Sequence, residues 1–233
     1  MKIEKLNWDS EFFGYQIGKL HLKEANYLNE GSFLEKSKPY KLVYVYSENP
    51  VTSDNITLKH VDSKVTFHKN LQNVNITHKQ SSCTPYKGND NDFETLLKLA
   101  YESGKYSRFR RDTNFVNNEF EKLYKRWVID SIKKIIAMEV LVYRDNSNIA
   151  GMITVADKRN GLAAIGLLAV SPEHQGKGIG GKLIGDAEYF VKMRNYSFMQ
   201  VVTQEINKDA MKVYFKNEYV ISDIIHIYHY WNV

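Results

Sequence analysis

The sequence has one cysteine, no long apolar run and no strong excess of either charge. The single cysteine, Cys83, excludes an internal disulfide framework and is typical of a reducing compartment. No apolar run approaches the roughly 20 residues that a membrane span needs, and the polar start MKIEKLNWDSE does not resemble a signal peptide. We therefore expect a cytoplasmic protein without a membrane partner.

The charge balance is mildly basic, with 32 Lys and Arg, 27 Asp and Glu, and a sequence pI ≈ 9.0. Such a dispersed excess suits an anionic small ligand and predicts no nucleic-acid partner. His226 and His229 lie in a β-like run at a spacing that places them on opposite faces of a strand, so we predict no metal site. Cys83 has no cationic cluster beside it in the sequence, so we do not expect it to act as a nucleophile.

A glycine cluster follows an apolar run between residues 162 and 182. The run LAAIGLLAV predicts a buried strand over 162–170, SPEHQ a connection, and GKGIGGK the start of a helix. Backbone N–H groups at a helix start bind phosphate, and glycines let a ligand approach the backbone closely. Three phosphate-binding patterns compete for these residues.

Two of the three patterns fit poorly. A dinucleotide fingerprint would use three of the glycines, with Glu205 as the ribose ligand. That fold, however, turns directly from strand into glycine and needs more βα units than follow here. A P-loop would match GxxxxGK, but Leu183 stands where a Ser or Thr must bind magnesium.

The third pattern, Q-x-x-G-x-G, is carried by Gln175, Gly178 and Gly180. With the preceding strand and the SPEHQ connection, it resembles motif A of the GCN5-related N-acetyltransferases, the GNAT superfamily. The resemblance implies acetyl-CoA as co-substrate, with its pantetheine arm on the strand end and its pyrophosphate on the glycine-rich amides. A purely structural helix start is the alternative. The implied coenzyme-binding residues are Leu168, Ala169, Val170, Gln175, Gly176, Lys177, Gly178, Ile179, Gly180, Gly181, Asn207 and Tyr214.

A second feature of this kind lies in the segment NKDAMKVYFKNEY. The spacing of Asn207 and Tyr214 places both side chains along one face of a helix. The resemblance implies that Asn207 binds the pantetheine arm and that Tyr214 gives a proton to the leaving thiolate, for which a phenol is suitably acidic. The alternative is a helix cap and a packing aromatic. Glu218 stands where the superfamily has a left-handed glycine; Asn217 tolerates that conformation better, which allows the turn to shift by one residue.

The general base is less well marked than the acid. The strand 162–170 contains no acidic residue, whereas many superfamily members place a glutamate there. Glu139 and Glu205 are the nearest alternatives by strand position. A water chain, or no dedicated base, fits equally well, because a sugar amine loses its proton more easily than lysine does.

The segments LNWDSEFFGYQIGKL and YSRFRRD, with the core above, resemble the bacterial TDP-fucosamine acetyltransferases. This resemblance implies a nucleotide-linked acceptor, the amino group of a dTDP-4-amino-4,6-dideoxyhexose used in polysaccharide biosynthesis. Arginines suit a diphosphate, and Phe109 or Tyr106 suits a sugar or base face, although a solvated basic loop is the alternative. A peptide, polyamine or antibiotic amine, or a non-catalytic acetyl-CoA-binding module, are rival functions. The candidate substrate-binding residues are Tyr106, Ser107, Arg108, Phe109, Arg110 and Arg111.

The order of elements predicts a mixed α/β fold. The resemblance implies the GNAT fold, with a central mixed, mostly antiparallel sheet flanked by helices and a smaller N-terminal α/β domain. The turn-rich segment TPYKGND sets the predicted boundary. Residues 1–85 are then an N-terminal domain for substrate binding or dimerisation, and residues 86–233 are the acetyltransferase domain.

Periodicity places the individual elements. An apolar stripe near the end of the sequence is expected to pack in a sheet or at a homodimer interface rather than stack on bases. It comprises Ile225, Ile227, Tyr228, Tyr230 and Trp231. Predicted helices cover 24–36, 92–101, 117–136, 178–194 and 209–216. Predicted strands cover 17–22, 41–47, 56–65, 74–78, 138–144, 149–157, 162–170 and 197–204, with a closing hairpin or strand pair over 219–231.

Overall fold

The computed structural model describes residues 1–22, 28–72, 81–88 and 90–232. The chain forms two compact units. The first contains Met1–Val65, Gln204–Ile206 and Asp223–Val233, and the second contains Thr66–Thr203 and Asn207–Ser222.

The first unit is built on strands β1 (Glu4–Lys5), β2 (Ile17–Leu22) and β3 (Leu42–Ser47), followed in the sheet by β10 (Val220–Trp231). β2 and β3 are parallel, and β10 is antiparallel to β3. Helices α1 (Asn7–Phe13) and α2 (Glu30–Ser37) complete the unit. Phe33 of α2 and Tyr228 of β10 are buried in its core, so the apolar stripe of β10 packs inside this unit.

The second unit carries the strands that follow β4 (Lys59–Asn70) in the order β4-β9-β8-β7-β6-β5. β9 and β8 are parallel, whereas the pairs from β8 to β5 are antiparallel. The bounds of these strands are β5 (Cys83–Pro85), β6 (Glu139–Asp145), β7 (Asn148–Asp157), β8 (Leu162–Val170) and β9 (Phe198–Gln204). The helices are α3 (Asp90–Ser103), α4 (Arg108–Arg111), α5 (Glu119–Ile132), α6 (Ile179–Lys192) and α7 (Lys208–Lys216), with a 3-10 turn over Pro172–His174.

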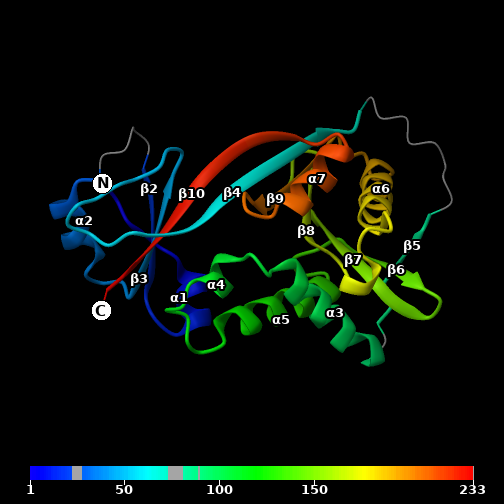
Figure 1. Cartoon of the computed structure of the whole chain (residues 1–233), viewed down its shortest axis with the longest axis horizontal. Helices are drawn as coiled ribbons and strands as arrows, with labels where there is room; N and C mark the ends of the chain where they lie inside the picture. Colours follow the sequence, from blue (N-terminus) through cyan, green and yellow to red (C-terminus); the bar gives the residue numbers. More distant parts are fainter. Residues whose placement is uncertain (23–27, 73–80, 89, 233) are drawn as a thin grey trace. The chain divides into compact units, whose positions relative to one another are not determined.

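Helices cover both faces of the second unit's sheet. α3 packs on α5 and on β7 and β8, while α6 packs on the same strands and on β6 (Figure 1). β7 is buried along nearly its whole length, as expected for a strand between two helical layers. The apolar spacing that predicted helices 92–101 and 178–194 therefore marks their sheet-facing sides. The mixed α/β prediction is confirmed.

Several details differ from the sequence prediction. The chain closes with one long strand, β10, rather than a hairpin, because residues 226–231 pair with β3 while the strand begins in the second unit. α1 falls in a segment where we expected no helix, and α4 falls inside the predicted loop. α5 ends at Ile132 instead of 136, since Lys134 adopts a left-handed conformation at φ 57°. The predicted strand 74–78 and part of the predicted helix 24–36 lie outside the described residues.

The boundary between the units also differs from the predicted one at residue 85. Residues 66–85 belong to the second unit, and the end of the chain returns to the first. β4 and β10 each continue from one unit into the other, and such long-range pairing leaves no turn signal in the sequence. No helix in the described part of the chain is long and apolar enough to cross a membrane.

Candidate active site

Strand β8 separates from β9 toward its C-terminal end. The two strands pair only over 162–165 and 198–201, so residues 166–170 have no strand partner on that side. On the other side the register with β7 shifts next to Thr154. The amide of Leu167 donates to Thr154 Oγ1 at 2.8 Å, which fixes this bulge. The arrangement leaves an unpaired backbone edge that an extended ligand can hydrogen-bond.

The start of α6 presents free backbone amides. Gly178 precedes the helix with φ 76°, and no side chain caps it. Gly176 has φ 77°, and at both glycines an added Cβ would meet no atom within 4 Å. The glycines are therefore required by the left-handed backbone and not by packing. The first N–H groups of α6 lack helical partners and carry partial positive charge, which suits an anion.

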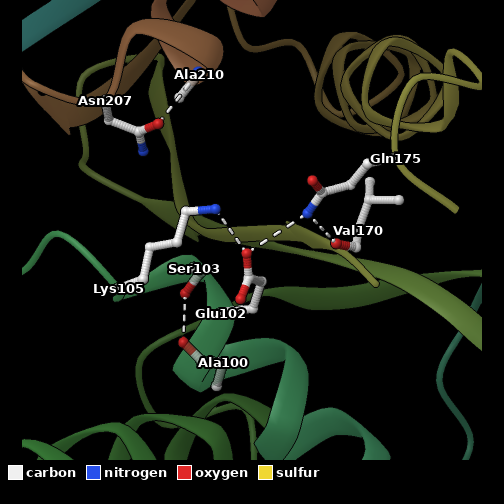
Figure 2. Close-up of polar contacts among 8 residues, drawn as sticks. All are labelled: Ala100, Glu102, Ser103, Lys105, Val170, Gln175, Asn207 and Ala210. Carbon is white, nitrogen blue, oxygen red and sulfur yellow. Dashed lines mark hydrogen bonds and ion pairs between the residues drawn. The ribbon is translucent and has the colours of Figure 1, made fainter. Parts of the chain in front are cut away.

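Gln175 links this glycine-rich segment to the end of β8. Its Nε2 donates to the Val170 carbonyl at 3.1 Å and lies 3.5 Å from Oε1 of Glu102 (Figure 2). The Val170 carbonyl, which belongs to the backbone predicted to hold the coenzyme, is thus already paired within the chain. Glu102 lies near the C-terminal end of α3, and the sequence analysis did not single it out.

Asn207 caps α7 and keeps one polar group available. Its Oδ1 accepts from the Ala210 amide at 3.3 Å, so Asn207 is the helix cap that the alternative predicted. The amide Nδ2 is not used by the cap, and Figure 2 shows it on the side that faces Lys105. A cap and a ligand contact are therefore compatible, because they use different atoms of Asn207.

Tyr214 lies in the last half of α7 and is 5% exposed. Its ring packs 5.4 Å from Phe67 and 6.2 Å from Tyr219, measured between centroids. Burial raises the pKa of the Tyr214 phenol, which keeps it protonated through the physiological range. The side chain is thus a packing aromatic that carries its proton at neutral pH.

The turn after α7 does not shift to Asn217. Glu218 itself adopts the left-handed conformation, with φ 64°, whereas Asn217 has φ −97°. The Asn217 side chain is engaged instead, because its Nδ2 donates to the Val213 carbonyl at 2.7 Å. Glu218 Oε2 lies 3.7 Å from Lys69, a long contact at a carboxylate that is 79% exposed and that offsets little of the backbone strain.

The two sequence-based candidates for a base lie in different places. Glu139 is 8% exposed, pairs with Lys134 at 3.1 Å and accepts from its own neighbour Val140. It belongs to the start of β6, opposite Val155, and is committed to these contacts. Glu205 belongs to the first unit, where its amide donates to the Ser63 carbonyl at 2.8 Å.

The arginine-rich segment forms the short helix α4. Ser107 caps it by accepting from the Phe109 amide at 3.3 Å. The ring of Phe109 is buried against Phe115 at 5.4 Å, so it belongs to the helical layer and offers no open stacking face. Arg108 lies 4.8 Å from the Phe109 ring, and Arg110 lies 5.2 Å from the ring of Phe120. Tyr106 is half-buried under the ammonium of Lys105, at 5.4 Å.

The comparisons with known proteins assign this unit. Residues 106–218, which run from the arginine-rich segment to the turn after α7, match the model of the acetyltransferase (GNAT) family. This segment is a GNAT acetyltransferase domain. The protein is therefore an N-acetyltransferase, and the resemblance drawn from motif A is confirmed at the level of the superfamily.

Solved structures agree in fold. The chain aligns with a functionally unknown conserved protein from Staphylococcus epidermidis at TM-score 0.62 and 14% identity, covering 94% of this chain and 84% of that one. A GCN5-related N-acetyltransferase from Sphaerobacter thermophilus gives 0.55 and 14%, over 87% and 65%. An acetyltransferase of the GNAT family from Colwellia psychrerythraea gives 0.54 and 10%, over 86% and 70%. No curated protein sequence matches the chain.

Cys83 lies apart from the acetyltransferase motifs and has a structural environment. Its amide donates to Asp186 Oδ2 at 2.8 Å, and burial raises the pKa of its thiol. A thiol held protonated is a poor nucleophile. Among the described residues, His, Cys, Asp and Glu side chains form no group of three that could hold a metal ion.

Proposed function

We propose that this acetyltransferase transfers the acetyl group of acetyl-CoA to the amino group of a nucleotide-linked amino-deoxy sugar of the dTDP-4-amino-4,6-dideoxyhexose class. Coenzyme binding is supported by two backbone segments whose hydrogen-bonding groups are open to a ligand. One is the edge of β8 over 166–170, and the other is the uncapped start of α6 after Gly178. An extended arm that ends in a diphosphate matches both.

The residues present fit coenzyme A. The amides of Ile179, Gly180 and Gly181 would hold the pyrophosphate, with Lys177 adding charge from an exposed position. Leu168 and Ala169 would bind the pantetheine arm through their backbone, and the free Nδ2 of Asn207 would donate to one of its carbonyls. The Val170 carbonyl is excluded from this set unless Gln175 releases it.

Acetyl-CoA supplies an activated acyl group, and the chain supplies position and protons. Tyr214 holds a proton at its phenol oxygen and gives it to the sulfur that departs when the carbon–sulfur bond breaks. Burial raises the pKa of the Tyr214 phenol, so the phenol is protonated when the thioester is attacked. Because a thiolate is a weaker base than this phenolate, the proton moves only while the carbon–sulfur bond breaks, and it returns to the tyrosine from solvent. No covalent protein intermediate is needed, since the acceptor nitrogen, once neutral, attacks the thioester carbon directly in a ternary complex. The nitrogen releases its protons to water, and the sulfur takes one from Tyr214.

The acceptor half rests on α4 and on two sequence segments. Arg110 and Arg111 are exposed on α4, where guanidinium groups suit the diphosphate of a nucleotide sugar. LNWDSEFFGYQIGKL and YSRFRRD resemble the TDP-fucosamine acetyltransferases, which act on such a substrate. The buried ring of Phe109 leaves Tyr106 as the aromatic candidate for the sugar or base. The first unit then has a role in acceptor binding or in homodimer formation.

Calorimetry with coenzyme A tests the first half of the proposal. Gly178→Ala introduces a side chain where φ is 76°, which distorts the helix start, so coenzyme affinity falls about tenfold or more. Gly185→Ala is the matched control, because Gly185 lies inside α6 with no atom within 4 Å of an added Cβ. The control binds as the wild type does. Absence of saturable binding to the wild type would remove the whole proposal.

A thiol-release assay with a panel of amines tests the second half. The panel holds nucleotide-linked 4-amino sugars, the corresponding free sugars, a peptide amine, a polyamine and an aminoglycoside. Nucleotide-linked sugars are expected to give the highest kcat/KM, and the free sugars to lose most of it. Preference for another amine would overturn the acceptor assignment, and binding without any turnover would favour a non-catalytic acetyl-CoA-binding module.

A further inference from the structure

Glu102 is a carboxylate in contact with the proposed coenzyme site that the proposed mechanism does not use. Its Oε1 accepts from Lys105 Nζ at 2.7 Å and lies 3.5 Å from Nε2 of Gln175. Since the same Nε2 holds the Val170 carbonyl, Glu102 lies beside the end of β8 (Figure 2). Its side chain is 28% exposed, so a ligand can reach it.

The partner of Glu102 is informative. Lys105 carries a primary ammonium, the same group as a protonated acceptor amine. Its Nζ lies 2.7 Å from Oε1 of Glu102. Lys105 is three residues from Glu102 and is 39% exposed, so its flexible stem can leave the pair at little cost. The Glu102 hydrogen bond is the main cause that raises the pKa of Lys105, with a smaller contribution from Asp209 of α7.

Figure 2 shows what surrounds this ammonium. Glu102 comes from α3, Gln175 and Val170 from the coenzyme side, and Asn207 from the start of α7. Through Glu102, the Lys105 ammonium therefore lies beside Gln175 and Val170, at the end of β8 where the proposed function places the coenzyme. The Glu139 carboxylate, which the sequence suggested as a base, accepts instead from Lys134 and from the Val140 amide.

We propose that Glu102 binds the ammonium of the acceptor substrate, and that Lys105 occupies this position in the free protein and is displaced when the acceptor arrives. The inference rests on the proposed acetyltransfer but not on the sugar. It assigns to Glu102 the binding of a primary amine as a cation beside the end of β8. Lys105 acts as an internal competitor, which lowers the affinity for weakly basic or poorly placed amines and thereby selects among acceptors.

Two single substitutions are expected to have opposite effects on the KM of the acceptor. Glu102→Gln keeps the shape but removes the charge, so KM rises about tenfold or more, the loss expected for a charge-assisted hydrogen bond. Lys105→Met removes the competitor, so KM falls by about two- to fivefold, the strength of an exposed ion pair. The acceptor used is whichever amine of the panel turns over fastest, so rejection of the sugar leaves this test intact.

Controls separate this role from a structural one. Lys212→Met removes another lysine three residues from an acid, in the exposed Lys212–Asp209 pair at 3.5 Å, and leaves KM unchanged. Coenzyme affinity by calorimetry stays within about twofold for Lys105→Met, and thermal unfolding checks that each variant is folded. If the ion pair only stabilised α3, substituting either Glu102 or Lys105 would shift KM in the same direction.

The proposal is overturned if Glu102→Gln keeps the wild-type KM, or if Lys105→Met raises it. If no amine of the panel is acetylated, the proposed function itself fails. If an amine is acetylated with unchanged KM in Glu102→Gln, only the present inference fails.

Discussion

The buried ion pair between Lys69 of β4 and Glu188 of α6 gives the sharpest stability prediction. Lys69 Nζ lies 3.1 and 2.9 Å from the two carboxylate oxygens of Glu188, and both side chains are 7% exposed. The ammonium also lies 5.7 Å above the ring of Tyr219, which packs on Tyr214. This pair therefore joins α6, the helix proposed to bind the coenzyme, to the surroundings of the proposed acid.

Lys69→Met should cost about 3–5 kcal/mol of unfolding free energy, because it leaves Glu188 as a buried carboxylate without a counter-ion. Such a loss is a large part of the roughly 5–15 kcal/mol that stabilises an ordinary domain. Replacing both residues by methionine should recover most of it, since two well-packed apolar side chains leave no buried charge.

The loss should also depend on pH. Burial raises the pKa of Glu188 above its usual 4.5 even with Lys69 beside it. A folded-state pKa above the unfolded one means that the folded protein binds the proton more tightly. The contribution of Glu188 to stability is therefore greatest below pH 4.5 and falls as pH rises through its folded-state pKa. Lys69→Met removes the cation that opposes this shift, so its deficit should be smaller at low pH than at high pH.

Urea unfolding followed by circular dichroism at acidic and at mildly alkaline pH measures both effects. The reasoning is refuted if Lys69→Met loses less than about 1 kcal/mol at alkaline pH, the value of an exposed pair. It is also refuted if the double variant is no more stable than the single one.

Three further substitutions test individual parts of the acetyltransferase domain. Tyr214→Phe keeps the ring contacts but removes the phenol proton, so kcat should fall about 10²–10⁴-fold. Calorimetry should show a coenzyme affinity within about twofold of the wild type. An unchanged kcat excludes Tyr214 as the acid. Glu218→Gly should raise the unfolding free energy by about 0.5–1 kcal/mol, because glycine relieves the left-handed strain at φ 64°, and a loss of stability would show that the Glu218 carboxylate matters more than the backbone. Gly104→Ala should destabilise by about 1–3 kcal/mol, since its Cβ would lie 2.3 Å from the Tyr124 ring, and a wild-type melting temperature would show that α3 and α5 can separate freely.

The strand and helix of the proposed coenzyme site were largely predictable from the sequence, because their signals are local. The apolar run 162–170 becomes β8 with the same bounds, and the glycines after it open α6 as expected. The N–H groups that a helix start presents to a phosphate belong to its own backbone, so a stretch of about 20 residues contains both the strand and the helix start. The bulge at Thr154 was not predicted, because it depends on the neighbouring strand.

The acceptor side was less predictable because it is assembled from distant side chains. Glu102 and Gln175 are separated by 73 residues in the chain. In the helical pattern of 92–101 the apolar positions predicted the buried face correctly, but a glutamate just beyond them looks like any solvated residue. The left-handed conformation of Glu218 was not predicted for a related reason. Residue propensity favours Asn217 for that conformation, but the Asn217 side chain donates to the Val213 carbonyl.

This division has a consequence for how such a domain changes its substrate. In the proposed site, coenzyme binding depends mainly on the backbone geometry around Gly178, so most substitutions of exposed side chains outside the glycine-rich segment should leave it intact. The proposed acceptor site uses side chains of the segment from Glu102 to Arg111, which lies outside α6 and β8. Variants with replacements confined to that segment should therefore keep the wild-type affinity for coenzyme A while their ranking of amines changes. Loss of coenzyme binding in most of them would mean that the two halves are not separable, and that Gln175 transmits changes at Glu102 to the coenzyme site.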